Sequence, residues 1–206
     1  MSQYFEIHPE SPQLRLIHRA VDIIRKGGVI VYPTETSYAI ACHLGDKQAL
    51  DKIRRIRQLD DKHNFTLVCK DLAQVSTFTK ISNDAYRLIK SLSPGAFTFI
   101  LEATREVPRR LQHPKKKTVG IRIPDHPVAQ LLVQELGEPL FSTTLLLPGE
   151  DEGMTDPYEI KSKLDNDLDL IIDAGIIDFE QTTIIEFSSE GAEIIRQGKG
   201  LAPMLG

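Results

Sequence analysis

Residues 27–36 read GGVIVYPTET, in which two glycines and an unbroken apolar run are followed by a proline and three polar residues. The glycines are typical of a helix end, and the apolar run predicts a strand buried on both faces of a sheet. In open α/β sheets, ligands usually bind in loops at the carboxyl ends of such strands. Thr34, Glu35 and Thr36 are therefore candidate ligand contacts. A simple turn, in which Pro33 fixes the backbone and the hydroxyls bond nearby backbone groups, explains the same residues without a ligand.

The segments around this strand alternate between helical and strand-like patterns. Apolar spacing, capping residues and first-turn prolines predict helices at residues 12–26, 46–59, 71–78, 82–92, 127–137 and from 156 onward. Strands are predicted at residues 28–33, 65–70, 96–103, 118–124, 139–147, 168–175, 182–187 and 192–198. The expected fold class is α/β (α+β), a twisted mixed β-sheet with helices on its faces.

The composition is that of an ordinary globular protein. A length of 206 residues with 41% apolar side chains suits one domain, so residues 1–206 are read as a single unit. The formal charge of −4 gives no overall attraction to nucleic acid or acidic membranes, so such a partner would need a local basic patch. The start of the chain has no leader pattern, and no apolar run is long enough to span a membrane, so we expect a cytoplasmic protein without a membrane partner. Cys42 and Cys69 lie in apolar strand-like runs without CxxC spacing, which predicts two buried, reduced thiols.

The common catalytic and metal-binding signatures are missing from the sequence. It contains no zinc-ligand spacing, HExxH, phosphate-binding P-loop, GxGxxG or GxSxG pattern, and we predict no metal ligands. The histidines are scattered without ligand spacing and are expected to be non-catalytic: His8, His18, His43, His63, His113 and His126.

Four further polar or turn-forming segments remain as candidates. The cations at Arg54, Arg55 and Arg57 suit phosphate, although an amphipathic helix also presents cations to solvent. Arg122 lies among apolar strand residues, so its charge should be paired or should hold an anionic ligand. The segments SPGAFTF (93–99) and FSTTLL (141–146) could approach a ligand, but a turn and ordinary strand threonines explain them equally well.

A basic loop is predicted between the strands at 96–103 and 118–124. It holds two prolines and six cations, so it should be exposed. Together with the helix end at Arg54, this loop is a candidate RNA-binding surface. Its proposed RNA contacts are Arg109, Arg110, Lys115, Lys116 and Lys117.

The motifs YPTET, SPGAFTF, VGIRIPDHP and PLFST, in this order, resemble the YrdC/YciO family of threonylcarbamoyl-adenylate synthases, and its YciO branch most of all. The resemblance covers about residues 14–200. It implies a YrdC-like sheet with a concave, positively lined surface. It also implies synthesis of threonylcarbamoyl-AMP and pyrophosphate from ATP, L-threonine and bicarbonate, with Mg2+ on the phosphates, for N6-threonylcarbamoylation of adenosine 37 in transfer RNA.

The resemblance also implies roles for individual residues. The threonine substrate would contact Thr34, Thr36, Arg122, Thr144 and Thr183, with Arg122 pairing with its carboxylate. ATP would contact Arg55, Arg57, Thr118, Ser142, Thr182 and Arg196. Catalysis, which consists mainly of aligning two anions, would depend on Arg55, Arg57 and Lys62.

The sequence departs from the family pattern at positions that would contact ATP. The family's Lys-x-Arg-Pro is Arg55, Ile56, Arg57 and Gln58 here, and DKHNF replaces a lysine-proline-leucine turn. The family's Ser-x-Asn ends at Leu146, which can neither donate nor accept a hydrogen bond.

These departures leave several functions open. They permit weak synthesis, a different carbamoyl acceptor, or binding without turnover. The alternatives are a non-catalytic domain that binds double-stranded RNA, transfer RNA or the ribosome, and a domain that binds a nucleotide or carbamoyl phosphate. RNA binding of this kind should weaken steeply with salt and show little sequence preference.

Overall fold

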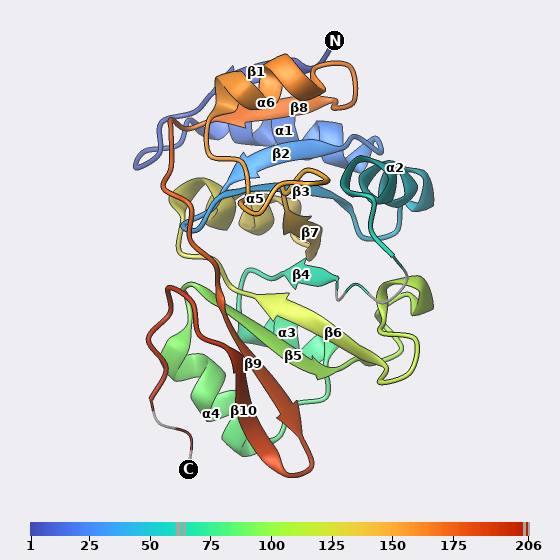
Figure 1. Ribbon diagram of the computed structural model, residues 1–206, viewed down its shortest axis with the longest axis vertical. Coiled ribbons are helices and arrows are strands. Elements are labelled where there is room, and N and C mark those ends of the chain that lie inside the picture. Colours follow the sequence, from blue (N-terminus) through green and yellow to red (C-terminus); the bar gives the residue numbers. More distant parts are fainter. Residues whose placement is uncertain (61–62, 64, 204, 206) are drawn as a thin grey trace.

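The computed structural model describes residues 1–60, 63, 65–203 and 205. Within them, one ten-stranded mixed sheet runs in the order β1-β8-β2-β3-β7-β4-β6-β5-β9-β10 (Figure 1). The strands are β1 Gln3–Glu6, β2 Ile30–Pro33, β3 Tyr38–His43, β4 Thr66–Val68, β5 Phe97–Glu102, β6 Thr118–Arg122, β7 Leu140–Thr144, β8 Leu170–Asp173, β9 Thr183–Ser188 and β10 Gly191–Arg196. The helices are α1 Leu14–Arg25, α2 Lys47–Arg57, α3 Leu72–Phe78, α4 Asn83–Leu92, α5 Pro127–Leu136 and α6 Pro157–Leu164, with a short 3-10 helix at Arg109–Leu111.

We call β1, β8, β2, β3 and β7 the upper strands and the remaining five the lower strands, following their places in Figure 1. The two sets join where β7 pairs antiparallel with β4. Parallel pairs link β1 to β8, β8 to β2, β4 to β6 and β5 to β9, and the other neighbours are antiparallel. The sheet is therefore mixed, as the sequence predicts.

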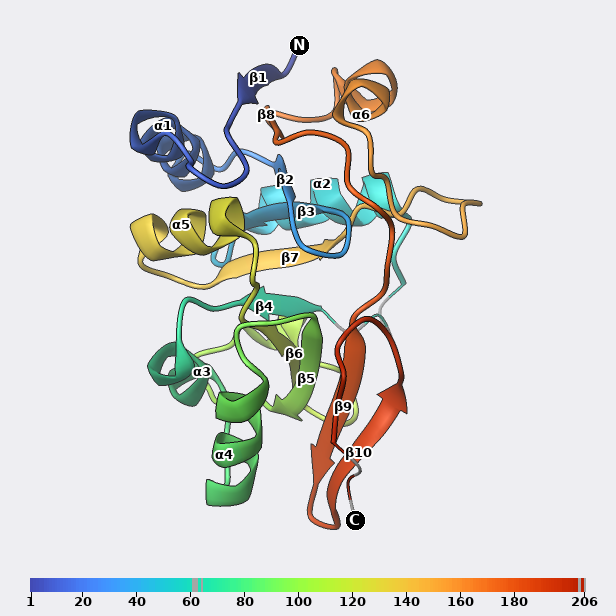
Figure 2. The ribbon, with the colours of Figure 1, turned by 90° about the vertical axis from the view of Figure 1, so that its left-hand side faces the viewer.

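Helices cover both faces of the upper strands. Figure 2 shows α1 and α5 on one side of these strands and α6 on the other, and α2 packs in the same core cluster as α6. The apolar stripe of α1, which includes Ile17, Val21 and Ile24, is buried against α5 and the sheet in one core cluster. The second cluster joins α2 and α6 to the opposite face and continues into the lower strands.

The lower strands are covered differently on their two faces. Leu67, Phe99 and Ile121 belong to the second core cluster, which also includes Val75 of α3 and Ile89 of α4. Figure 2 shows α3 and α4 together on one side of these strands. The alternate residues of the same strands point the other way, because successive side chains of a strand face opposite sides of the sheet. That second face carries the cavities described below.

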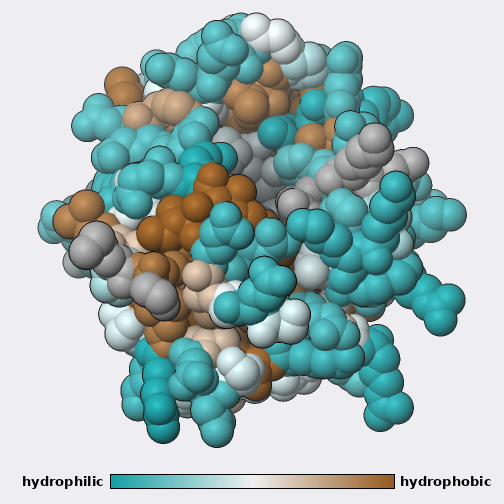
Figure 3. Space-filling view, turned by 60° about the horizontal axis from the view of Figure 1, so that its bottom comes forward, coloured by the Kyte–Doolittle hydropathy of each residue, from teal (hydrophilic) through white to brown (hydrophobic). Residues whose placement is uncertain are grey.

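Some large apolar side chains of the chain are exposed. Tyr86 of α4, Ile195 of β10 and Leu201 are among the exposed large hydrophobic residues. Figure 3 looks onto the lower end of the molecule, where apolar surface gathers in one part of the face and hydrophilic residues surround it.

All predicted helices and strands form, with some boundaries changed. The first helix begins at Leu14 rather than at Pro12, and Gln58 in a left-handed conformation ends α2 at Arg57. Strand β1 was not predicted, and only the apolar run around Cys42 indicated β3. Both cysteines are buried and free, as predicted. No helix in the described part of the chain is both long and apolar enough to cross a membrane.

Candidate functional site

Two adjoining cavities lie where the upper and lower strands join. The inner cavity, about 160 Å³, is lined by Ala39, His63, Thr66, Val68, Thr98, Ile100, Gly120, Arg122, Ser142, Thr143, Thr144, Thr182, Ile184 and Arg196. The outer cavity, about 350 Å³, is lined by Thr36, Arg57, His63, Thr143, Thr144, Leu146, Asp151, Gly153, Phe179, Glu180, Gln181, Thr182 and Arg196. Because five residues line both, the two cavities form one continuous site.

The floor of the inner cavity is the uncovered face of the lower strands. Thr66 of β4, Thr98 of β5 and Gly120 of β6 alternate with the core residues of the same strands. Gly120 keeps this floor open, since a β-carbon there would lie 3.0 Å from Thr66 Oγ1 and 3.1 Å from the carbonyl oxygen of Phe65. The cavity therefore depends on a missing side chain as well as on the strand pattern.

In the turn after β2, one threonine hydroxyl stabilises the turn and another threonine lines a cavity. Thr34 Oγ1 donates to the carbonyl oxygen of Ser37 at 2.7 Å and accepts from the backbone nitrogens of Thr36 and Ser37 at 3.2 and 3.3 Å. Thr34 is buried and lines neither cavity, so its hydroxyl holds the turn together. Thr36 Oγ1 lies 3.0 Å from Thr34 Oγ1, and Thr36 lines the outer cavity.

Arg122 at the end of β6 is paired with the carboxylate of the turn. Its Nη2 donates to Glu35 Oε1 at 2.5 Å, and the two side chains are only 10% and 13% exposed. Glu35 Oε2 also accepts from the backbone nitrogen of Asp125 at 3.2 Å. Arg122 Nε is buried and has no hydrogen-bond partner among the described residues. Glu35 thus takes a hydrogen of Nη2, while Nε, on the same edge of the guanidinium, keeps a donor without a partner among the described residues.

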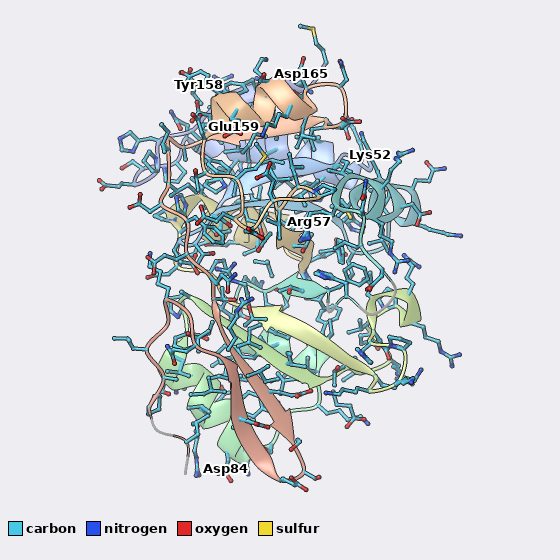
Figure 4. All side chains as sticks on the ribbon, in the orientation of Figure 1. Lys52, Arg57, Asp84, Tyr158, Glu159 and Asp165 are labelled. Carbon is cyan, nitrogen blue, oxygen red and sulfur yellow. The ribbon has the colours of Figure 1, made fainter. Side chains whose placement is uncertain are left out.

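Arg57 and Arg196 bring two further cations to the site. Figure 4 places Arg57 between the upper and lower strands, and its Nε and Nη1 are buried without a hydrogen-bond partner in the described part of the chain. Arg196 donates through Nε and Nη2 to the carbonyl oxygen of Thr182 at 3.1 and 3.0 Å. Burial lowers the pKa of both guanidinium groups, yet arginine keeps its charge in proteins. The site is therefore suited to anions.

His63 lines both the inner and the outer cavity as a neutral group. Its Nε2 lies 3.2 Å from Thr143 Oγ1, and its ring meets Phe65 edge-on. Burial, and then the charge of Arg57, lowers the pKa of His63 to about 4. At neutral pH the ring therefore offers one donor and one acceptor without adding charge.

The two tyrosines of the turn reach in different directions. Tyr32 Oη lies 2.7 Å from Ser142 Oγ behind the inner cavity, and burial raises the pKa of Tyr32 to about 12. Tyr38 Oη donates to the carbonyl oxygen of Gly175 at 2.7 Å and accepts from the backbone nitrogen of Ala174 at 3.1 Å. Both phenols stay protonated at neutral pH, so they orient neighbouring groups.

The structure brings together seven of the predicted small-molecule contacts and places four elsewhere. The residues that line the cavities are Thr36, Arg57, Arg122, Ser142, Thr144, Thr182 and Arg196. Thr34 is in the turn as described, and Arg55 is exposed on α2. Thr118 is buried at the start of β6 with no partner for its Oγ1 among the described residues, and Thr183 Oγ1 donates to the carbonyl oxygen of Gly200. Lys62 lies outside the described residues.

The basic loop is exposed, as predicted, and is tied to α2 and β9. Arg54 Nη2 donates to the carbonyl oxygen of Arg110, and Arg110 Nη2 donates to that of Gly45, at 3.2 and 3.1 Å. Lys116 Nζ lies 2.9 Å from Glu186 Oε1. The exposed cations of this loop are Arg105, Arg109, Arg110, Lys115, Lys116 and Lys117. None of them lines the inner or the outer cavity, so the basic loop is a separate surface.

Comparison with known proteins identifies the family of this chain. The family model Sua5_yciO_yrdC, described as "Telomere recombination", matches residues 22–198. The chain belongs to the Sua5/YciO/YrdC family. The protein YciO of Escherichia coli K12 is 52% identical over 200 residues, 97% of each chain, and its crystal structure matches with a TM-score of 0.93.

More distant members of the Sua5/YciO/YrdC family carry a named activity. The threonylcarbamoyl-AMP synthase of Coxiella burnetii RSA 493 is 31% identical over 183 residues, covering 87% of this chain and 96% of that protein. A crystal structure of P. abyssi Sua5 complexed with L-threonine has a TM-score of 0.87 at 23% identity, covering 96% of this chain and 58% of that one. The latter comparison shows a shared fold.

The importance of several residues in or behind the cavity walls was missed by sequence reasoning. Glu35 was noted as part of the turn, but nothing local indicates that it pairs with an arginine 87 positions away. His63 was dismissed because it has no ligand spacing, and Asp151 and Phe179 lie in loops without a motif. Gly153 lies in a crowded place that only the folded chain reveals. A β-carbon added to it would lie 2.8 Å from Thr144 Cγ2 and 3.2 Å from Phe179 Cε2.

Proposed function

We propose that the chain forms threonylcarbamoyl-AMP and pyrophosphate from ATP, L-threonine and bicarbonate, in the cytoplasm, as the activated donor for adenosine 37 of transfer RNA. The observation that carries the proposal is the convergence of Thr36, Arg57 and Arg122, from three separate segments, on adjoining cavities. The named activity of the Coxiella burnetii relative supports it.

The proposed reaction needs alignment of anions more than acid–base catalysis. The threonine amine and bicarbonate give a carbamate with loss of water, and a carbamate oxygen attacks the α-phosphorus as pyrophosphate leaves. Arg122 would hold the threonine carboxylate through the guanidinium donors that Glu35 does not use. Arg57 and Arg196 would lie against the phosphates and reduce their repulsion of the carbamate.

The hydroxyls of the site would orient these anions. Thr36 of the turn, Ser142 and Thr144 of β7, and Thr182 before β9 come from three segments and line the cavities. Hydroxyl groups donate to carboxylate or phosphate oxygens and accept from an amine, so they suit both substrates. Because Tyr32 lies against Ser142, the Ser142 hydroxyl is already oriented before a ligand binds.

Magnesium would arrive with ATP. No group of three metal-ligating side chains occurs among the described residues, so these do not form a complete protein cage for a cation. Mg2+ is commonly held by one or two carboxylates together with substrate phosphates. Asp151, which lines the outer cavity, is a carboxylate that fits this arrangement.

The test is a synthesis assay with ATP, Mg2+, L-threonine and 14C-labelled bicarbonate. Labelled threonylcarbamoyl-AMP should appear with an equal amount of pyrophosphate, should require threonine, and should be lost in Arg122→Ala. If ATP binds but neither product nor pyrophosphate forms, this function is wrong.

A second candidate function is binding of double-stranded RNA or transfer RNA by the basic loop. The exposure of Arg109, Lys115 and Lys117 favours it, because phosphate contacts dominate such binding. This surface is separate from the cavities, so the two functions can be tested by different substitutions.

A further inference from the structure

We propose that Glu35 is a positioning residue that orients Arg122 so that the guanidinium donors not bound to Glu35 meet a carboxylate ligand. This inference rests on the proposed function for the identity of that ligand. Glu35 itself does not line either cavity, so its action would pass through Arg122.

The first step is the geometry of the guanidinium. Glu35 Oε1 accepts from Arg122 Nη2 at 2.5 Å, which fixes the plane of the group. Arg122 Nε remains buried without a partner among the described residues, while Arg122 lines the inner cavity. A buried donor without a partner is costly, so a ligand oxygen that accepts from it would recover that free energy.

The second step is that contacts other than Arg122 hold both the side chain and the main chain of Glu35 in place. Its second oxygen accepts from the backbone nitrogen of Asp125, and Lys199 Nζ donates to its carbonyl oxygen at 2.9 Å. The carbonyl oxygen of the next residue, Thr36, accepts from the backbone nitrogen of Glu180 at 2.9 Å. Because its carboxylate is held by Asp125 and its main chain by Lys199 and Glu180, Glu35 stays on Arg122 when a ligand binds, so it orients the arginine instead of competing for the site.

The third step is charge. Glu35 neutralises Arg122, so this part of the site has little net charge. Arg57 and Arg196 have no carboxylate hydrogen-bonded to them in the described part of the chain, although Asp151 lines the same outer cavity. A singly charged carboxylate therefore suits Arg122, and the more highly charged phosphates suit the other two arginines.

The experiment compares the full-length wild type with Glu35→Gln, Glu35→Asp and a control, Glu186→Gln, whose carboxylate binds Lys116 outside the cavities. Calorimetry measures binding of L-threonine and, separately, of inorganic pyrophosphate. We expect Glu35→Gln to weaken the binding of L-threonine about tenfold or more. The affinity for pyrophosphate should be unchanged or higher, since the substitution removes one negative charge. Asp is one methylene shorter and cannot reach both Arg122 and Asp125, so it should restore binding only in part. Equal threonine affinity in wild type and Glu35→Gln would overturn the inference.

A nuclear magnetic resonance measurement separates this inference from the proposed function. The Nε–Hε signal of Arg122, assigned with Arg122→Lys, should shift when acetate is added to the wild type and should not shift in Glu35→Gln. If the wild type binds no threonine, the proposed function fails, and the acetate shift still decides the role of Glu35. The same acetate response in both proteins would refute that role.

Discussion

Arg196 donates hydrogen bonds from two guanidinium nitrogens to the carbonyl oxygen of Thr182, and its Nη2 also lies 3.2 Å from Thr182 Oγ1. The contact joins the last residue of β10 to the residue that precedes β9, and both side chains line both cavities. One cation is thus fixed at the site by the hairpin that carries it.

This contact predicts that Arg196→Lys weakens ATP binding. Lysine keeps the charge but cannot make the paired contact, so we expect a loss of about 1 kcal/mol in unfolding free energy and a severalfold weaker ATP affinity. Denaturant unfolding and calorimetry measure the two effects. Arg87→Lys on the exposed face of α4 is the control, and an unchanged ATP affinity in Arg196→Lys would argue against a role for Arg196.

Arg57→Ala should lower the rate of synthesis by about 10²- to 10³-fold, as loss of one preorganised electrostatic contact does. Its stability should change little, because the replaced side chain has two buried nitrogens without partners among the described residues. Arg55→Ala is a matched control on the same helix, since Arg55 is exposed and lines neither cavity. Steady-state rates with saturating ATP provide the comparison. If Arg57→Ala and Arg55→Ala lower the rate of synthesis equally, the total charge of α2 matters and the position of Arg57 does not.

Leu146→Asn should strengthen ATP binding. Leu146 lines the outer cavity where the resemblance expects an asparagine, and an amide there adds donors and an acceptor. One gained hydrogen bond of about 0.5–1.5 kcal/mol corresponds to roughly 2- to 12-fold in affinity. Leu146→Ala controls for removal of the leucine. If Asn and Ala have the same effect on ATP affinity, the position does not contact the nucleotide.

His63 should make stability fall as the solution becomes acidic. Its pKa is about 4 in the folded chain and about 6.5 in an unfolded one, so between these values only the unfolded chain binds the proton. This group alone should lower the unfolding free energy by up to about 1.4 kcal/mol per pH unit as the pH falls through that window. Denaturant unfolding of wild type and His63→Gln from pH 7 to pH 4 measures the difference. Parallel pH profiles would show that His63 is not protected in the fold.

If the basic loop binds RNA, affinity for a double-stranded RNA should fall steeply with salt. Lys115→Gln with Lys117→Gln should reduce the slope of log affinity against log salt by up to about one for each lost phosphate contact. Threonine and ATP binding should be unaffected, because neither residue lines the cavities. Filter binding at several salt concentrations gives the slope. An affinity that salt does not change would rule out this mode of binding.

The order of strands and helices could be predicted because each element carries its own pattern. Asp46, Asp71 and Ser82 cap their helices with side-chain acceptors, as short sequence windows suggest. Strand β1 could not be predicted in this way, because it is held by pairing with β8, about 165 residues later in the chain. Local propensity does not contain such a long-range partner.

The candidate site was predicted in outline but not in detail. Arg55 and Arg57 look alike in the sequence, but residues two apart on a helix point to different sides, so the packing of α2 decides which of them lies at the cavity. Thr34 and Thr36 are likewise equivalent in the motif, yet one hydroxyl is used by the turn and the other lines the site. The charge of Arg122 was expected to be paired or to hold a ligand, and the identity of its partner required the fold.

The position of β8 between β1 and β2 affects the order in which the molecule can be completed. During translation, β1 and β2 emerge early but have no partner between them until residues 170–173 have been made. Thr182 and Arg196 are translated later still, on the last hairpin. The ribosome must therefore release nearly the whole chain before the cavities exist, and a truncated nascent chain would expose polar cavity walls that lack Arg196.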